Sequence, residues 1–415
     1  MASAAAELWE PHVLAHAKAR LFPEDDRPGT YAVVDTQFAR DTWLDGESVD
    51  AAVREQLAPY NHVRIGGGYP DLIGVGPLDS ELLGVERLGD EPPLVAVEAK
   101  GVTAHGAIDV QRGVVQAYDR LAEANVAYLA APARGISQTD RSLAERLNVG
   151  ILGVEEGGTV EPVVTPRVVG KRSTDEASAI RFQAGAQGVA DQSFGLNHPK
   201  NYLGYVLAHH ATGATAELLE EYSVVGATDD ARRGAAFLGL VEVNPDGVAL
   251  TPLGRDVVRF ALARHGSVEA ALGEFEQWYR TADRFYDVAP VWGELTRRVV
   301  FAYPATRLLV EELQALHGDG LTAPSLVDLV VYLHQRHPAF TVELFVRGEE
   351  TIRRRVLTED GELRESQLAD GGIYHAPTVF QLKTMLFHAG LLTTRGTEPS
   401  RLEPTADVWA LREPV

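Results

Sequence analysis

Three charged residues, Asp71, Glu98 and Lys100, are the strongest candidates for chemistry in this sequence. Glu98 and Lys100 lie two positions apart in the apolar stretch LVAVEAKG, and Asp71 opens the stretch DLIGVG. A charged group in such an apolar stretch needs a partner or a purpose, because burial without one is costly. Two carboxylates and the Ala99 carbonyl are the oxygen ligands that Mg²⁺ prefers, with Mn²⁺ as the alternative ion. A lysine beside the ion would orient a bound water and help to deprotonate it, while the ion stabilises charge growing on a phosphate.

Strand geometry is what would bring these side chains together. Successive side chains of a strand point to opposite faces, so Glu98 and Lys100 project from one face, roughly 7 Å apart. If DLIGVG returns beside LVAVEA through the intervening hairpin, Asp71 joins them at one end of the sheet. The alternative is structural: a surface ion pair of Glu98 and Lys100 contributes about 0 to 1 kcal/mol, and an aspartate after proline commonly opens a turn. Both interpretations remain open at this point.

The first 165 residues alternate strand and helix patterns, which predicts an α/β domain with a partly parallel sheet. The runs typical of strands are YAVVDT, PDLIGV, LVAVEAKG, VAYLAAP and VGILGVE. The clearest helix is DVQRGVVQAYDRLAEA, in which two stripes lie about 110° apart. The apolar stripe holds Val110, Val114, Ala117 and Leu121, and the polar stripe holds Asp109, Arg112, Gln116 and Arg120.

The pair Pro70-Asp71, followed by Glu98-Ala99-Lys100, resembles the motif of the PD-(D/E)xK nuclease superfamily. The resemblance covers roughly residues 50 to 155, with strand, hairpin, strand, amphipathic helix and two further strands in the family's order. It implies a restriction-endonuclease-like mixed sheet flanked by helices. It also implies Mg²⁺-dependent hydrolysis of DNA, with Asp71, Glu98 and the Ala99 carbonyl as metal ligands and Lys100 acting on the attacking water.

The resemblance also suggests supporting residues. Family members often carry a Gln and a Tyr on the helix, and the residues Gln116 to Tyr118 are similar, so Gln116 would position a water or a phosphate. Members commonly add a glutamate from the preceding helix. Glu55 in VDAAVREQLAPY would take this place, and Glu10 is the alternative that the sequence does not exclude.

The remainder of the chain reads as mainly α-helical, with a linker and two small modules. Residues 166–200 are rich in Gly, Ser and Gln and are interpreted as a linker. Residues 201–265 run helix, strand, NPDG turn, strand and helix, which is the layout of a winged helix. A helical spacer at 266–323 separates it from a weaker echo at 324–415, predicted to be a second winged-helix-like module.

Four other features have two interpretations each. His209-His210 is more typical of a helix end than of a metal site, and the glycine-rich RIGGGYP is either a tight turn or an approach to substrate. The basic run TIRRRVL would either contact phosphates or form local ion pairs with nearby acids. Arg232 and Arg233 lie on the expected recognition helix, which would contact DNA or a partner protein.

Composition sets the class of protein. The formal charge is −21, and only five of the 38 basic residues are lysines, which is typical of halophilic proteins kept soluble at high salt. The absence of cysteine excludes disulfides, thiolate metal sites and a cysteine nucleophile. The N-terminal stretch lacks the pattern of a signal peptide, and no run is apolar and long enough to span a membrane, so a cytoplasmic location with no membrane partner is expected.

The sequence therefore predicts a metal-dependent DNA endonuclease that acts in restriction, defence or repair, with winged helices that hold duplex DNA. The alternatives are a non-catalytic DNA-binding regulator, or a subunit of a nuclease complex, that uses the nuclease fold as a platform. A homodimer would account for double-strand cuts, because one site cuts one strand, and partner proteins of a defence or repair complex are the other expected contacts.

Overall fold

The computed structural model divides the chain into two compact units. Unit 1 combines residues 1–187 with 333–368, and unit 2 combines residues 188–332 with 369–415. The described residues are 8–23, 30–43, 46, 48–84, 92–103, 105–169, 180, 181, 184, 198–244, 247–278 and 283–413. Among them, no helix is both long and apolar enough to cross a membrane.

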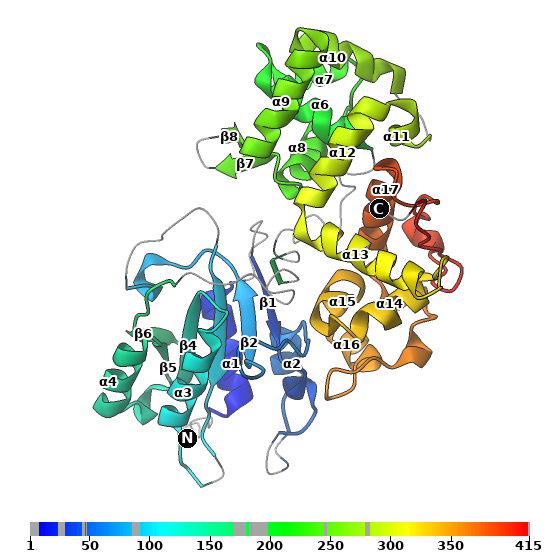
Figure 1. Ribbon diagram of the computed structural model, residues 1–415. Coiled ribbons are helices and arrows are strands. Elements are labelled where there is room, and N and C mark those ends of the chain that lie inside the picture. Colours follow the sequence, from blue (N-terminus) through cyan, green and yellow to red (C-terminus); the bar gives the residue numbers. More distant parts are fainter. Residues whose placement is uncertain are drawn as a thin grey trace. The chain divides into compact units, whose positions relative to one another are not determined.

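A six-stranded mixed sheet in the order β1-β2-β3-β4-β5-β6 forms the centre of unit 1 (Figure 1). The strands are β1 (Tyr31–Val34), β2 (Leu72–Val75), β3 (Leu94–Ala99), β4 (Val126–Pro132), β5 (Gly150–Val154) and β6 (Val160–Val164). The first three pair antiparallel, β3, β4 and β5 pair parallel, and β6 returns antiparallel at the edge. The prediction of a mixed sheet flanked by helices is confirmed, and β6 is the strand that the sequence pattern missed.

Helices cover both faces of this sheet (Figure 1). Helix α1 (Glu10–Leu21) packs on the face that carries Val95, Val97 and Ala99 of β3. Helices α3 (Val110–Arg120) and α4 (Gln138–Leu147) cover the alternate side chains of β4 on the opposite face. The short elements of unit 1 are η1 (Thr36–Ala39), α2 (Ala51–Leu57), η3 (Ser80–Leu82) and η4 (Ala133–Gly135).

Local signals explain where two of these helices begin. The Asp109 side chain accepts the N–H of Arg112 and thereby caps α3, and Ser137 and Asp140 form a reciprocal capping box at α4. Helix α3 ends at Arg120 and not later in the predicted run, because residues 121–123 form a turn.

Residues 333–368 belong to unit 1, although they follow unit 2 in the chain. They hold α15 (Pro338–Phe345), α16 (Glu350–Val356) and η6 (Glu365–Gln367). Glu343 of α15 is buried and forms an ion pair with Arg353, and it accepts hydrogen bonds from Tyr31 and from Asn61. This division differs from the expected module at 324–415, because a buried charge network joins its first part to β1.

Unit 2 is mainly helical (Figure 1). Its first part holds α6 (Pro199–His210), α7 (Thr215–Glu221), α8 (Thr228–Phe237), β7 (Val241–Asn244), β8 (Gly247–Leu250) and α9 (Pro252–His265). The expected order of helix, hairpin and helix is found there, with β7 and β8 antiparallel. The linker expected at 166–200 lies mostly outside the described residues, but Ile180 and Ala184 are buried in the core of unit 1.

The rest of unit 2 continues as helices. They are α10 (Val268–Phe275), η5 (Glu276–Trp278), α11 (Phe285–Val288), α12 (Pro290–Ala302), α13 (Pro304–Gly318), most of α14 (Leu326–His334), η7 (Gly371–Ile373), α17 (Ala376–His388) and η8 (Pro399–Arg401). After α17, the described residues form isolated bridges, Leu392 with Leu411 and Ser325 with Val408, where a hairpin of named strands was expected. The likeness of this C-terminal part to the first module is therefore limited to a helix followed by extended segments.

Candidate active site

Asp71 and Glu98 lie opposite each other where β2 begins and β3 ends. Leu72 pairs with Val97, so the residue before Leu72 and the residue after Val97 are direct neighbours across the two strands. Both carboxylates are buried, with exposed fractions of 5% for Asp71 and 2% for Glu98. The main-chain N–H of Ala99 donates to Asp71 Oδ2 (2.7 Å). The structure thus brings together the two carboxylates that the sequence singled out.

The second oxygen of Asp71 has its own partner. Gln37 of η1 donates through Nε2 to Asp71 Oδ1 (3.1 Å), a contact that the sequence pattern gave no reason to expect. The Asp71 carboxylate is therefore fixed by one main-chain and one side-chain donor, which orients it at the edge of the sheet.

Lys100 projects from the end of β3 toward helix α1. Its Nζ donates to the Ala99 carbonyl (2.9 Å) and lies 3.3 Å from Glu10 Oε1. Gly101 permits this approach, because a Cβ there would collide with the backbone of Trp9 and Glu10. Glu10 is therefore the helix acid that the structure places beside the lysine.

Glu55, the preferred helix acid of the sequence interpretation, lies elsewhere. It is an exposed residue of α2, and no hydrogen bond or ion pair among the described residues connects it with Asp71, Glu98 or Lys100. The choice between Glu55 and Glu10 depends on how α1 packs on the sheet, because Glu10 is 90 positions from Lys100 in the sequence.

A buried arginine is the main feature that the sequence interpretation did not assign. Arg120 donates through Nε to Glu98 Oε1 (2.7 Å), and its side chain is 8% exposed against 3% for Glu98. Its other nitrogens donate to the carbonyls of Ile65 (3.0 Å) and Tyr69 (3.4 Å). Arg120 therefore ties the end of β3 to the glycine-rich turn that precedes Asp71. Its place on the polar stripe of the helix was the available sequence signal.

Helix α3 presents a second polar group to the same region. Gly113, Gln116 and Arg120 share one helix face because they are spaced by three and four residues. A Cβ at Gly113 would lie 2.9 Å from Lys100 Cγ, so this face approaches β3 closely. Gln116 lies between the two contacts, and its Oε1 is buried with no hydrogen-bond partner among the described residues.

The electrostatics of the group favour an added cation. Burial, followed by the charges of Glu98 and Glu10, raises the pKa of Asp71 well above the ordinary aspartate range. Burial also raises the pKa of Glu98, although Arg120 and Lys100 oppose this shift. Burial raises the pKa of Glu10 in the same way, against the opposing effect of Lys100. When all three are ionised, they share only the two close cations Lys100 and Arg120, so a bound divalent cation would relieve the cost of their charges.

The oxygen atoms at this site have the ligand chemistry of a hard divalent cation. Carboxylate and carbonyl oxygens of Asp71, Glu98 and Ala99 are the right ligand chemistry for Mg²⁺, which keeps several of its waters. The unpartnered oxygen of Gln116 is an acceptor that a water could satisfy. No group of three or more His, Cys, Asp or Glu side chains within the described ranges is arranged to hold a metal ion. The protein would therefore supply two carboxylates, one of which is now paired with Arg120.

The other candidate features have structural roles in the described residues. His209 hydrogen-bonds through Nε2 with the Val248 carbonyl (3.0 Å), as expected for a helix-end residue. The basic run forms ion pairs, Arg353 with Glu343 and Arg354 with Glu350.

The glycine-rich turn and the arginines of the recognition helix also have partners. The N–H of Gly67 donates to Asp119 Oδ2 (2.8 Å), so the turn packs against the end of α3. Arg232 and Arg233 form ion pairs with Asp229 and Asp230 on their own helix.

Comparison with known proteins gives no independent guide. No family model matches the sequence, and neither a curated protein nor a solved structure matches the chain. The function must therefore be argued from the geometry of this site.

Proposed function

We propose that the protein is a metal-dependent nuclease that hydrolyses phosphodiester bonds of DNA. The observation that carries the proposal is the convergence of Asp71, Glu98 and Lys100, with Glu10 beside the lysine, at one edge of a mixed sheet. The order β2, β3, α3, β4, β5 agrees with the strand, strand, helix and two further strands that the resemblance to PD-(D/E)xK nucleases implies.

Each residue has a role in this proposal. Asp71, Glu98 and the Ala99 carbonyl would hold Mg²⁺ or Mn²⁺, which would polarise the phosphate and lower the pKa of a bound water. Lys100 is positioned by the Ala99 carbonyl and by Glu10, so its ammonium would orient the attacking water toward the phosphate. Gln116 would hold a water through its unpartnered oxygen.

Unit 2 would bind duplex DNA. Helices α6, α7 and α8 precede the β7–β8 hairpin, and this is the order of a winged helix, with α8 as the recognition helix. Arg232 would exchange its exposed partner Asp229 for a phosphate, since such a surface pair contributes little on its own.

One observation favours a second function, that of a non-catalytic DNA-binding platform. Glu98 is held in a buried ion pair by Arg120, and a metal ion must compete with this guanidinium for the carboxylate. If this ion pair persists in the presence of Mg²⁺, the site would bind no metal ion. The fold would then serve only to bind DNA.

Cleavage assays separate the two functions. Supercoiled plasmid, linear duplex and branched DNA would be incubated with protein in molar KCl with Mg²⁺ or Mn²⁺, comparing wild type with Lys100→Ala. Arg134→Ala is the control, because Arg134 is an exposed cation of the same unit, paired with exposed Glu156. Metal-dependent cutting by wild type and Arg134→Ala that is lost in Lys100→Ala supports the nuclease. DNA binding without cutting under all metals supports the platform.

A further inference from the structure

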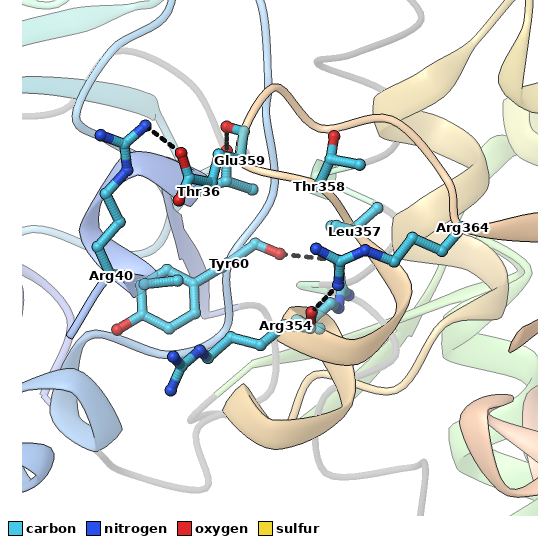
Figure 2. A pocket seen from close by; sticks show the side chains of 10 residues that line it. Thr36, Arg40, Tyr60, Arg354, Leu357, Thr358, Glu359 and Arg364 are labelled. Carbon is cyan, nitrogen blue, oxygen red and sulfur yellow. Dashed lines mark hydrogen bonds and ion pairs between the residues drawn. The ribbon is translucent and has the colours of Figure 1, made fainter.

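A second polar site lies in unit 1, in a pocket of about 190 Å³ between the β1 side of the sheet and the end of α16 (Figure 2). It is lined by Thr36, Ala39, Arg40, Tyr60, Arg353, Arg354, Leu357, Thr358, Glu359 and Arg364. Four of the charged lining residues are arginines and one is a glutamate, which is unusual in a chain with a formal charge of −21.

The four arginines are not equivalent. Arg353 is fully engaged by buried Glu343, and Arg354 forms ion pairs with Asp41 (3.0 Å) and Glu350 (3.1 Å). These ion pairs fix Arg353 and Arg354 in the pocket wall. The other two arginines, Arg40 and Arg364, are the candidates to bind a ligand.

Arg364 and Arg40 are the cations available to an anion. Arg364 donates to the carbonyls of Arg354 and Arg355 (3.2 Å for Arg355), and within the described ranges it has no carboxylate partner. Arg40 is 47% exposed and is paired with Glu359 (2.6 Å), whose side chain is 64% exposed. Figure 2 shows the Arg364 side chain reaching into the pocket from one side, while Arg40 lies on the opposite side with its guanidinium turned toward Glu359. The pocket thus presents one uncompensated guanidinium and one held by an exposed, displaceable carboxylate.

The pocket and the Asp71 site share one structural element. Thr36 of η1 lines the pocket and donates through Oγ1 to the Glu359 carbonyl (2.9 Å). The next residue, Gln37, donates to Asp71 Oδ1. A ligand held in the pocket therefore lies beside the same short helix that orients the candidate metal ligand.

We propose that this pocket binds a backbone phosphate of the nucleic-acid substrate, at a position next to the bond that the Asp71 site would cut. The inference rests on the proposed nuclease function for the source of the phosphate. Guanidinium groups bind phosphate oxygens in a forked geometry that no other side chain provides. Since the surface as a whole repels nucleic acid, a local group of arginines must supply the contact. Glu359 occupies Arg40 until a phosphate replaces it.

Equilibrium binding of fluorescent duplex DNA, in EDTA and across a series of KCl concentrations, tests the pocket. All proteins would carry Lys100→Ala to prevent cutting, and Arg364→Gln and Arg40→Gln would be added singly. Each arginine variant is expected to weaken binding roughly tenfold and to reduce the slope of log K against log salt by about one. Glu359→Gln is expected to tighten binding several-fold, because it removes the internal competitor for Arg40.

The controls separate the pocket from general charge and from folding. Arg134→Gln removes an exposed charge of unit 1 and should leave affinity and slope close to those of the parent. Arg364→Gln also loses two hydrogen bonds at the end of α16, so its thermal unfolding is compared with that of Arg40→Gln, whose side chain has one ion-pair partner. Unchanged affinity in Arg40→Gln and Glu359→Gln overturns the proposal, whatever Arg364→Gln does.

The outcomes also distinguish this proposal from the nuclease proposal. DNA binding that depends on the pocket, together with no cleavage by wild type under any metal, keeps the pocket and refutes the nuclease. Cleavage by wild type with no effect of the pocket variants on affinity keeps the nuclease and refutes the pocket. A protein that binds no DNA at any salt concentration refutes both.

Discussion

Replacement of Arg120 by methionine tests the electrostatic account of the site most directly. Both side chains of the Arg120–Glu98 pair are under a tenth exposed, and their 2.7 Å contact is the shortest that either makes. Arg120→Met fills similar volume but leaves the Glu98 carboxylate buried beside Asp71 and Glu10 without this cation. Removal of one partner of a buried ion pair typically costs about 3 to 5 kcal/mol of stability.

The expected fall in the midpoint of thermal unfolding follows from this loss of stability and from the number of residues in unit 1. A loss of 1 kcal/mol lowers the midpoint of thermal unfolding by about 2 to 4 °C in a unit of 150 to 250 residues, so Arg120→Met should lower it by roughly 6 to 20 °C. The matched surface change, Arg134→Met, breaks an exposed pair with Glu156 and should cost about 0 to 1 kcal/mol.

A double-mutant cycle identifies the cause. Urea unfolding would be measured for Arg120→Met, Glu98→Gln and the double variant, without divalent ions. If the buried charge is responsible, the double variant should lose about 2 kcal/mol less than the sum of the single variants. Added Mg²⁺ should then stabilise Arg120→Met more than wild type, because the ion no longer competes with a guanidinium for Glu98.

Two results would refute this reasoning. One is a loss below 1 kcal/mol in Arg120→Met, which would mean that the carboxylate finds water or protonates without cost. The other is strict additivity in the cycle, which would assign the loss to the hydrogen bonds that Arg120 makes with the turn carbonyls.

Three further changes test other parts of the structure. Asp71→Asn should stabilise the protein at pH 7, because burial and acidic neighbours raise the pKa of Asp71 and its charged form opposes folding. Urea unfolding should show this gain vanishing below the ordinary aspartate pKa, where both states are protonated, and a loss at pH 7 would contradict it. Burial lowers the pKa of His388 to about 3, so the contribution of His388 to stability should fall as pH drops below about 6.5, by up to about 1.4 kcal/mol per pH unit. His388→Gln should flatten that slope, and an unchanged slope would exclude His388 as its source. Glu343→Gln should cost about 3 kcal/mol because it leaves buried Arg353 without its carboxylate, whereas a change within about 0.5 kcal/mol in urea unfolding would show that the pair contributes nothing.

Local patterns in the sequence determined much of unit 1. The apolar runs at residues 31–34, 72–75 and 94–99 became neighbouring strands, as is typical of short, continuous apolar runs whose side chains are buried on both faces of a sheet. Alternation along β3 then required Glu98 and Lys100 to point to one face. Composition and periodicity were sufficient for this, since each depends on residues close together in the chain.

The partners of the site residues depended on tertiary structure. Glu10 reaches Lys100 because Gly101 lets helix α1 approach the end of β3, and nothing near Glu10 in the sequence signals that contact. Arg120 was identified as polar, but its burial against Glu98 follows from the docking of α3 on the sheet.

The segment 333–368 is a second case in which the sequence pattern did not predict long-range tertiary contacts. Its helices read as part of a C-terminal module, yet Glu343 and Arg353 bury their charges against Tyr31 and Asn61, some 300 residues earlier. The sequence by itself thus determined which charged residues lie at the ends of β2 and β3, and that Glu98 and Lys100 share one face. The alternation of side chains along a strand is a local property, so the sequence pattern was sufficient for this. Only the tertiary structure decided which opposite charges meet them, because the cost of burying a charge is relieved by whichever partner packing brings within hydrogen-bond distance.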